Sequence, residues 1–234
     1  LQVKEDKRIV RSDFDRIYRE DWWPLSFLSL NDYDVNITYS VFLECLKWRK
    51  SFNIHNISLL ELRSLFMKKA MYLHGEDLQG RRILWINLKQ IEATERNFTK
   101  LLIYWLERNA TETCGAPLQF LFDMSGSGLQ NLEVEAVKFA LHACKYYFPG
   151  CMGGLLVYEC PPIFDALCKL VLSWIDIRAH CRLRRITRDT VTKYVSPENL
   201  PFHMGGKVWY FFPIFCNSST DKIFEIGWIS KDIF

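Results

Sequence analysis

The sequence has little of what marks a membrane-spanning protein or a nucleotide-dependent enzyme. None of its apolar runs reaches the ~18 residues that a transmembrane helix needs. It contains no G-x-x-x-x-G-K-S/T or G-x-G-x-x-G loop to hold phosphates, and no G-x-S-x-G turn to present a nucleophilic serine. These absences exclude the commonest ATPase, dinucleotide-binding and hydrolase signatures, and we expect no cofactor.

Metal-binding and disulfide patterns are also missing. The eight cysteines include no C-x-x-C pair and no zinc-type spacing. Several lie inside apolar runs, where a reduced cysteine packs like a small hydrophobic residue, so we expect free thiols and no metal site. A secreted origin stays open, because five N-x-S/T sequons exceed the roughly one that chance would give. The sequons begin at Asn36, Asn56, Asn97, Asn109 and Asn217.

Net charge is low. At +3, with 24% charged residues, the chain is too weakly basic to indicate a nucleic-acid partner. Positive charge is concentrated in one tract, whose arginines are Arg178, Arg182, Arg184, Arg185 and Arg188. The tract predicts docking on an anionic membrane surface, where each basic side chain contributes about 1 kcal/mol. The alternative is an edge strand whose charges prevent unwanted pairing.

The sequence does contain a large apolar fraction, 49%, of which aromatic residues make up a good part. Apolar residues recur at helical spacing over 4–20, 38–51 and 58–69, which predicts three helices. Trp22-Trp23-Pro24 is expected to end the first of them. We therefore predict a helical region over residues 1–70, ahead of the main domain.

A different pattern begins after residue 70. Four short apolar runs typical of strands alternate with helical segments, which predicts crossover units and a mostly parallel sheet. The strands are expected at 83–88, 118–124, 155–160 and 183–187, and the helices at 100–110, 131–148 and 163–178. We predict an α/β domain over 71–208, followed by an aromatic extension over 209–234.

The segment 163–178 is the most informative in the chain. Its polar residues Asp165, Lys169, Ser173 and Asp176 form one narrow stripe, and most of the remaining circumference is apolar. A surface helix is normally apolar along one stripe only. This helix therefore needs cover on two sides. One side is the protein core, and the other is more protein, a bound lipid or a membrane surface.

The chain offers few catalytic candidates. Ser125 follows a strand but lacks the nucleophile-elbow glycines. Cys181 resembles the nucleophile of a phosphatase loop, but Thr187 stands where that loop has its arginine. Asp123 is more simply explained by hydrogen bonding to the turn that follows it. A hydrolase that uses Ser125 or Cys181 is the weakest hypothesis for this chain.

Several motifs in a fixed order resemble the CRAL-TRIO (Sec14-like) family. They are FLECLKWRKSF, GEDLQGRRILWINL, FLFDMSG, YYFPG, the PPIF start of the long apolar helix, and ENLPFHMGG. The resemblance implies a hydrophobic pocket floored by the sheet and closed by 163–178 as a mobile gate. It also implies a protein that holds or transfers a lipid-like molecule without catalysis. Its place would be the cytoplasmic face of membranes, among them the endoplasmic reticulum.

The residues of this expected pocket come from the gate and from the strands. The gate candidates are Phe164, Leu167, Leu170, Val171 and Trp174. The strand candidates are Leu84, Ile86, Phe120, Phe122, Leu156 and Tyr158. Because these strands are apolar on both faces, the sequence leaves open which alternate set points inward.

Two departures from the family pattern bear on the ligand. Members that transfer phosphatidylinositol carry Glu-Arg after the YYP motif and Ser-Lys-Ile after the gate. Here Gly150 and Cys151 stand in the first place, and that tripeptide is absent. We therefore do not expect phosphoinositide transfer of the familiar kind. A second hypothesis is an adaptor that fills its pocket with its own side chains and contacts a membrane or protein through the gate or the basic tract.

Overall fold

The computed structural model describes residues 7–92, 97–131, 133–174, 183–208, 210–215 and 224–229. Four α-helices come first, α1 (Arg11–Arg19), α2 (Trp22–Leu30), α3 (Val35–Phe52) and α4 (Leu59–Met67). The Asp34 carboxylate accepts a hydrogen bond from the Ile37 backbone N–H (2.9 Å) and caps the start of α3. Asn53, in the left-handed region at φ 59°, ends that helix.

Helix α2 is a correction to the sequence prediction, which has only a helix end at Trp22-Trp23-Pro24. The three residues do separate α1 from the next segment, but they also begin a helix of their own. Pro24 lies in the first turn of α2, where backbone N–H groups have no partner within the helix and a missing one costs little. Trp23 and Phe27 are the buried residues of α2.

Five strands form the main sheet in the order β1-β2-β3-β4-β5. They are β1 (Met71–Glu76), β2 (Arg82–Asn87), β3 (Leu118–Asp123), β4 (Met152–Tyr158) and β5 (Leu183–Ile186). Strand β1 is antiparallel to β2, and β2 to β5 are parallel. The predicted α/β class and mostly parallel sheet are confirmed. The antiparallel strand β1 adds to the four strands that the sequence predicts.

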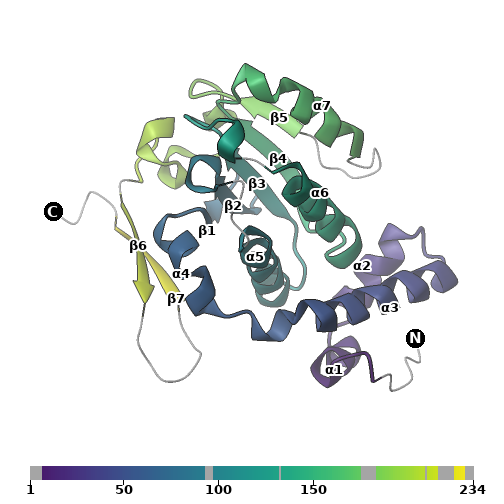
Figure 1. The fold of residues 1–234 in the computed structure, drawn as a ribbon. Helices are drawn as coiled ribbons and strands as arrows, with labels where there is room; N and C mark the ends of the chain where they lie inside the picture. The colour runs from purple at the N-terminus through teal and green to yellow at the C-terminus, as the bar shows by residue number, and fades with distance from the viewer. Residues whose placement is uncertain are drawn as a thin grey trace.

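Three helices connect the parallel strands, α5 (Phe98–Thr113), α6 (Val134–His142) and α7 (Asp165–Trp174). Because sequential parallel strands lie side by side, right-handed crossovers put all three helices on one face of the sheet. Figure 1 shows α5, α6 and α7 over that face, with α1 to α3 beyond the end of α5 and α6. A π-helical turn, Ala143–Tyr147, extends α6.

Short 3-10 helices join several of these elements. They lie at Ile54–Asn56, Leu88–Gln90, Leu129–Asn131, Pro162–Phe164, Val191–Lys193, Pro197–Asn199 and Phe202–Met204. A separate antiparallel pair, β6 (Tyr210–Phe215) and β7 (Phe224–Ile229), follows them. This pair occupies part of the predicted aromatic extension, in which no strand is predicted from the sequence.

The pairing register separates the two faces of the sheet. Leu84, Phe120 and Leu155 are aligned across β2, β3 and β4. All three belong to the cluster under the helices, which includes residues of α5. Trp85 and Leu121 instead pack on the other face, in a cluster that the segment from β5 to Met204 completes. The core therefore has two layers, one on each side of a buried sheet.

The N-terminal helices are attached to α5 by a buried ion network. Arg49 of α3 donates to both Glu107 oxygens, at 2.8 and 2.7 Å. Arg16 of α1 donates to Glu107 at 2.8 Å, and Asp13 lies 2.9 Å from Arg49. Trp48 of α3 also stacks on Tyr147, with ring centroids 3.7 Å apart. The YYFPG motif thus helps to hold the helical region in place.

Candidate functional site

Helix α7 carries apolar side chains toward the core and toward solvent. Phe164 just before it, and Cys168 and Val171 on it, are buried. Ile163 in the turn before α7 is 57% exposed, and Leu170 and Leu172, which flank Val171 on either side, are 40% and 50% exposed. The predicted need for cover beyond the core therefore has a structural counterpart, because the described residues bury Val171 but leave Leu170 and Leu172 exposed.

Helix α6 is also loosely covered. None of its residues is buried, although it lies next to α5 and adjoins α7. Val137, Phe139 and Leu141 pack against the main cluster but each keeps part of its surface accessible. A helix in the middle of such a layer normally buries its apolar stripe completely. The α6–α7 part of the layer is therefore less tightly packed than the α5 part.

The floor beneath these two helices is partly accessible. Phe122 belongs to β3, the central strand, and its neighbours in the register are Ile86 and Val157. Those neighbours are only 1% and 5% exposed, whereas Phe122 is intermediate. Leu183 of β5 and Leu167 of α7 are likewise intermediate and contact the same two clusters. These partly accessible apolar side chains mark the candidate ligand site.

Exposed polar contacts hold α7 against its neighbours. Asp165 at its start pairs with Arg185 of β5 at 2.7 Å, with both side chains about half exposed. At its other end, the Lys138 ammonium of α6 lies 5.9 Å from the centre of the Trp174 ring. Exposed contacts of these two kinds contribute about 0–1 kcal/mol each. Most of the attachment of α7 must therefore come from Phe164, Cys168 and Val171.

The sequence-predicted pocket residues do not all share one face. Leu84, Ile86, Phe120 and Phe122 lie under the helices with the inner residues of α7. Leu156 and Tyr158 lie on the opposite face and pack with Val191 and Met204. The same-face residues of β4 are Leu155 and Val157, which the prediction omits. Side chains alternate along a strand, but the apolar sequence of β4 contains no signal that tells the two sets apart.

The described part of the basic tract is exposed but not free of partners. Arg184 and Arg185 lie on β5, an edge strand, and Arg188 lies in the turn after it. Arg184 contacts Tyr194, with 3.4 Å between its Nη1 and the hydroxyl oxygen. Arg178 and Arg182 lie outside the described residues. The membrane-docking role and the edge-protection role are both compatible with this placement.

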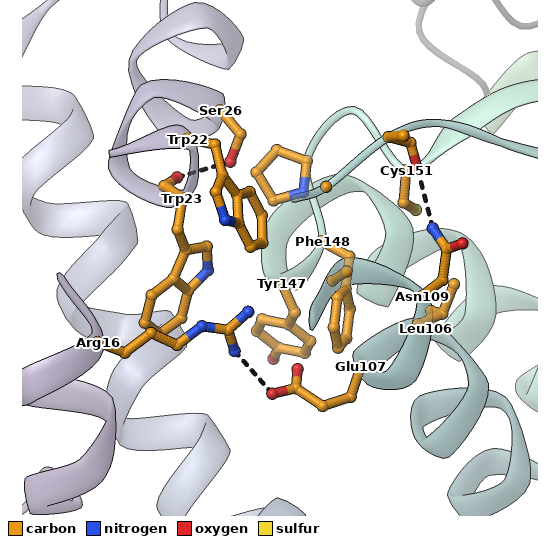
Figure 2. Close-up of a pocket in the computed structure, with 14 residues that line it drawn as sticks. Arg16, Trp22, Trp23, Ser26, Leu106, Glu107, Asn109, Tyr147, Phe148 and Cys151 are labelled. Carbon is orange, nitrogen blue, oxygen red and sulfur yellow. Dashed lines mark hydrogen bonds and ion pairs between the residues drawn. The ribbon is translucent and has the colours of Figure 1, made fainter. Parts of the chain in front are cut away.

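A pocket lies away from the predicted gate, at the junction of the helical region and the sheet domain. Figure 2 shows Trp22, Trp23 and Arg16 on one side of it, facing Tyr147 and Phe148. Its volume is about 20 Å³, which is room for about one or two water molecules. This pocket is far too small for an acyl chain, and we regard it as a packing defect of the junction.

The carboxyl end of β3 holds a polar cluster without the arrangement of a hydrolase. Asp123 accepts hydrogen bonds from His203 Nε2 (2.7 Å) and from the hydroxyl (2.6 Å) and backbone N–H (3.0 Å) of Ser125. Burial raises the pKa of Asp123, but the bonds from His203 and Ser125 outweigh it, so the pKa is lowered. Ser125 thus donates to a carboxylate rather than to a histidine base. Cys181 lies outside the described residues.

Two kinds of feature are absent from the residues that the structure describes. Among them, no group of three or more His, Cys, Asp or Glu side chains is placed to hold a metal ion. In the same ranges, no helix combines the length and apolar character required to cross a membrane.

Comparison with known proteins gives a consistent set of relatives. A family profile for the CRAL/TRIO domain matches residues 66–206. The chain is 22% identical over 217 residues to the CRAL-TRIO domain-containing protein C3H8.02 of Schizosaccharomyces pombe, covering 85% of this chain and 49% of that protein. It is 26% identical over 159 residues to the phosphatidylinositol transfer protein CSR1 of Eremothecium gossypii, covering 64% and 36%. The chain thus spans about half or less of these curated relatives.

The fold has a solved counterpart. The crystal structure of Sfh5 aligns with a TM-score of 0.59 at 12% identity, over 80% of this chain and 71% of that one. The family profile covers more than half of the sequence, and it spans the sheet, the candidate gate and the ENLPFHMGG segment. The chain belongs to the CRAL-TRIO family.

Proposed function

We propose that the protein binds one hydrophobic, lipid-like molecule between the sheet and helices α6 and α7, and transfers or presents it at membranes without catalysis. The observation that carries the proposal is the accessible surface of Phe122, on the central strand between the buried Ile86 and Val157. A central-strand ring beneath a fully packed helical layer would have no such surface. Room above Phe122 for an apolar guest explains it.

Helix α7 has the properties of a gate for this space. Its polar attachments are weak and exposed, so displacing it breaks few strong contacts. In water the displaced helix would expose its buried face as well as Leu170 and Leu172. A membrane surface would cover that area, at about 25 cal/mol per Å² of apolar surface removed from water. Opening is therefore expected on the membrane rather than in solution.

We propose that the apolar part of the ligand dominates its recognition. One of the relatives is named a phosphatidylinositol transfer protein. In this chain, however, the two positions after the YYFP motif are the uncharged Gly150 and Cys151. Cys151 is buried beside the small junction pocket rather than near α7. The side chains that line the candidate site, Phe122, Leu167 and Leu183, offer no hydrogen bond to a headgroup.

We also propose that the protein acts at the cytoplasmic face of membranes, with the endoplasmic reticulum as one location. The exposure of Arg184 and Arg188 supports contact with an anionic surface. These arginines follow the candidate gate in the chain, so docking through them would bring α7 to the membrane.

Native mass spectrometry of the purified protein tests the proposal. We expect a fraction of the protein to carry an extra mass that is released on collision, and organic extraction to yield a molecule with an acyl or similar apolar chain. A single unliganded mass, together with unchanged binding to vesicles and no extraction of lipid from them, would replace this proposal with the adaptor hypothesis.

A further inference from the structure

The thiols of Cys160 and Cys168 meet where α7 begins. Their sulfur atoms are 3.7 Å apart, at van der Waals contact. Cys160 follows the end of β4, and Cys168 lies in the first turns of α7, eight positions later in the chain. The segment between them contains Pro161 and the 3-10 turn Pro162–Phe164.

An outward movement of α7 would pivot at this segment, because the segment connects the helix to β4. Pro161 and Pro162 restrict the backbone before the helix, and Phe164 anchors that end among Leu88, Met124 and Val157. Any outward swing of α7 about this segment moves Cys168 away from Cys160. A covalent link between the two sulfurs would therefore oppose the swing.

We propose that Cys160 and Cys168 are a modification site at which a hydroperoxide forms a reversible disulfide that holds α7 against the sheet. We call this disulfide-linked state the lock. Its formation depends only on the two cysteines and the segment between them, whereas its effect on lipid rests on the function proposed above. The pair is chosen because its sulfurs are 3.7 Å apart and a disulfide needs them about 2.05 Å apart, so a small movement is enough to form the bond. Cys160 lies outside regular helix and strand, so rotation of its side chain can close most of that gap.

The reaction balances with hydrogen peroxide as oxidant. The Cys160 thiolate attacks one peroxide oxygen, the O–O bond breaks, and a sulfenic acid and hydroxide form; the hydroxide takes up a proton to give water. The Cys168 thiol then attacks the sulfenic sulfur, loses its proton and displaces a second hydroxide, which leaves as water. Two thiols are oxidised by two electrons, and one peroxide is reduced to two waters. A dithiol such as dithiothreitol reverses the step by exchange.

The surroundings predict slow oxidation at neutral pH. Burial, and then the neighbouring thiol of Cys168, raise the pKa of Cys160 to about 11. The charged groups around the pair are Arg185 on β5, which favours the thiolate, and Asp165 on α7, which opposes it. Because the thiolate is the attacking form, the rate should rise with pH toward that value.

Peptide mapping tests formation of the bond. Cleavage after Tyr158 and Phe164 places the two cysteines in separate peptides, which a disulfide keeps joined. After treatment of the whole chain with peroxide, we expect the joined peptides, their loss with dithiothreitol, and their absence in Cys160→Ser. The Cys114→Ser variant is the matched control, because Cys114 is an exposed free cysteine elsewhere, and it should still give them. Absence of the joined peptides, or pairing of Cys160 with Cys151 instead, overturns the proposal.

Amide hydrogen exchange tests the lock without any lipid. We expect exchange over 165–174 to slow at least several-fold in the oxidised protein and to be unchanged by peroxide in Cys160→Ser. Fluorescent-lipid transfer between vesicles should slow in parallel and recover with dithiothreitol. Unchanged exchange in the mapped disulfide form would overturn the lock. If exchange slows on oxidation but the reduced protein transfers no lipid, the lock is supported and the proposed lipid-transfer function is wrong.

Discussion

Arg49 and Glu107 form a bidentate ion pair that joins α3 to α5, with the Arg49 side chain only 1% exposed. Through this pair the N-terminal region meets α5 by two charge-assisted hydrogen bonds. Asp13 and Arg16 extend it toward α1. The position of the helical region therefore depends on charged side chains that are largely buried, with Arg49 1% and Glu107 22% exposed.

Replacing Arg49 with Met should destabilise the protein strongly. The change removes the guanidinium that lies 2.9 Å from the buried Asp13 and leaves the His55 ring, 3.0 Å away, beside that carboxylate. Removing one partner from a buried pair costs about 3–5 kcal/mol, and urea denaturation would measure it. Arg108→Met is the control, because its pair with Glu112 is about one-third exposed on both sides and should cost at most about 1 kcal/mol. Equal midpoints for the two variants would contradict this account of the junction.

His74 should make the protein less stable between about pH 6.5 and pH 4. Burial lowers the pKa of His74 from 6.5 to about 4, so in this window the unfolded chain binds a proton that the folded chain does not. Stability therefore rises with pH through the window and falls as the pH is lowered. The free energy of unfolding of His74→Gln should depend less on pH there. A parallel pH dependence of variant and parent would show that His74 is not responsible.

The sheet could be predicted from sequence because most of its strands are strongly apolar and bounded by turns. Strand β1 was the exception, since Tyr72, His74 and Gly75 interrupt its apolar character. Its place is determined by the turn after it, where Asp77 accepts bonds from the backbone N–H groups of Gln79 and Arg81, both at 2.9 Å. This turn brings β1 alongside β2, and the antiparallel pairing with β2 holds the segment in an extended conformation.

The candidate site could be predicted only in part. The composition of α7 alone indicates a helix apolar on two sides, which Leu170 and Val171 illustrate by their different exposure. The orientation of β4 could not be predicted, because Leu155 and Leu156 are equivalent in composition and only the register with β3 distinguishes them. The open packing around α6 depends on contacts between distant segments, which no local pattern in its sequence records.

Filling the candidate site should reduce ligand binding. Leu167 is half buried between the two clusters that meet at Phe122, so Leu167→Trp places a larger ring in the proposed space. We expect at least a tenfold loss of bound lipid per protein, with a change in stability within the ~1–3 kcal/mol typical of overpacking. Leu172→Trp adds the same volume on the exposed side of α7 and is the matched control. Equal lipid content in the two variants would place the ligand elsewhere.

The exposed apolar side chains of α7 should control transfer rather than binding. Leu170→Asp together with Leu172→Asp puts charge on exposed positions, which leaves the core intact. Val171→Asp would not be suitable, because Val171 is buried and an unpaired charge there would unfold the helix. We expect unchanged lipid content and thermal unfolding, but transfer between vesicles that is slower by an order of magnitude or more. Normal transfer by this variant would mean that α7 does not meet the membrane.

Charge reversal in the basic tract should separate its two possible roles. Arg184→Glu with Arg188→Glu leaves the Arg185–Asp165 pair in place, so α7 keeps its attachment. Each lost basic contact with an anionic bilayer is worth about 1 kcal/mol, and the reversal should therefore lower binding to phosphatidylserine vesicles by at least roughly thirtyfold. Binding to phosphatidylcholine vesicles, which carry no net charge, serves as the control and should change little. If vesicle binding is retained but the variant aggregates, the arginines protect the edge of β5 instead.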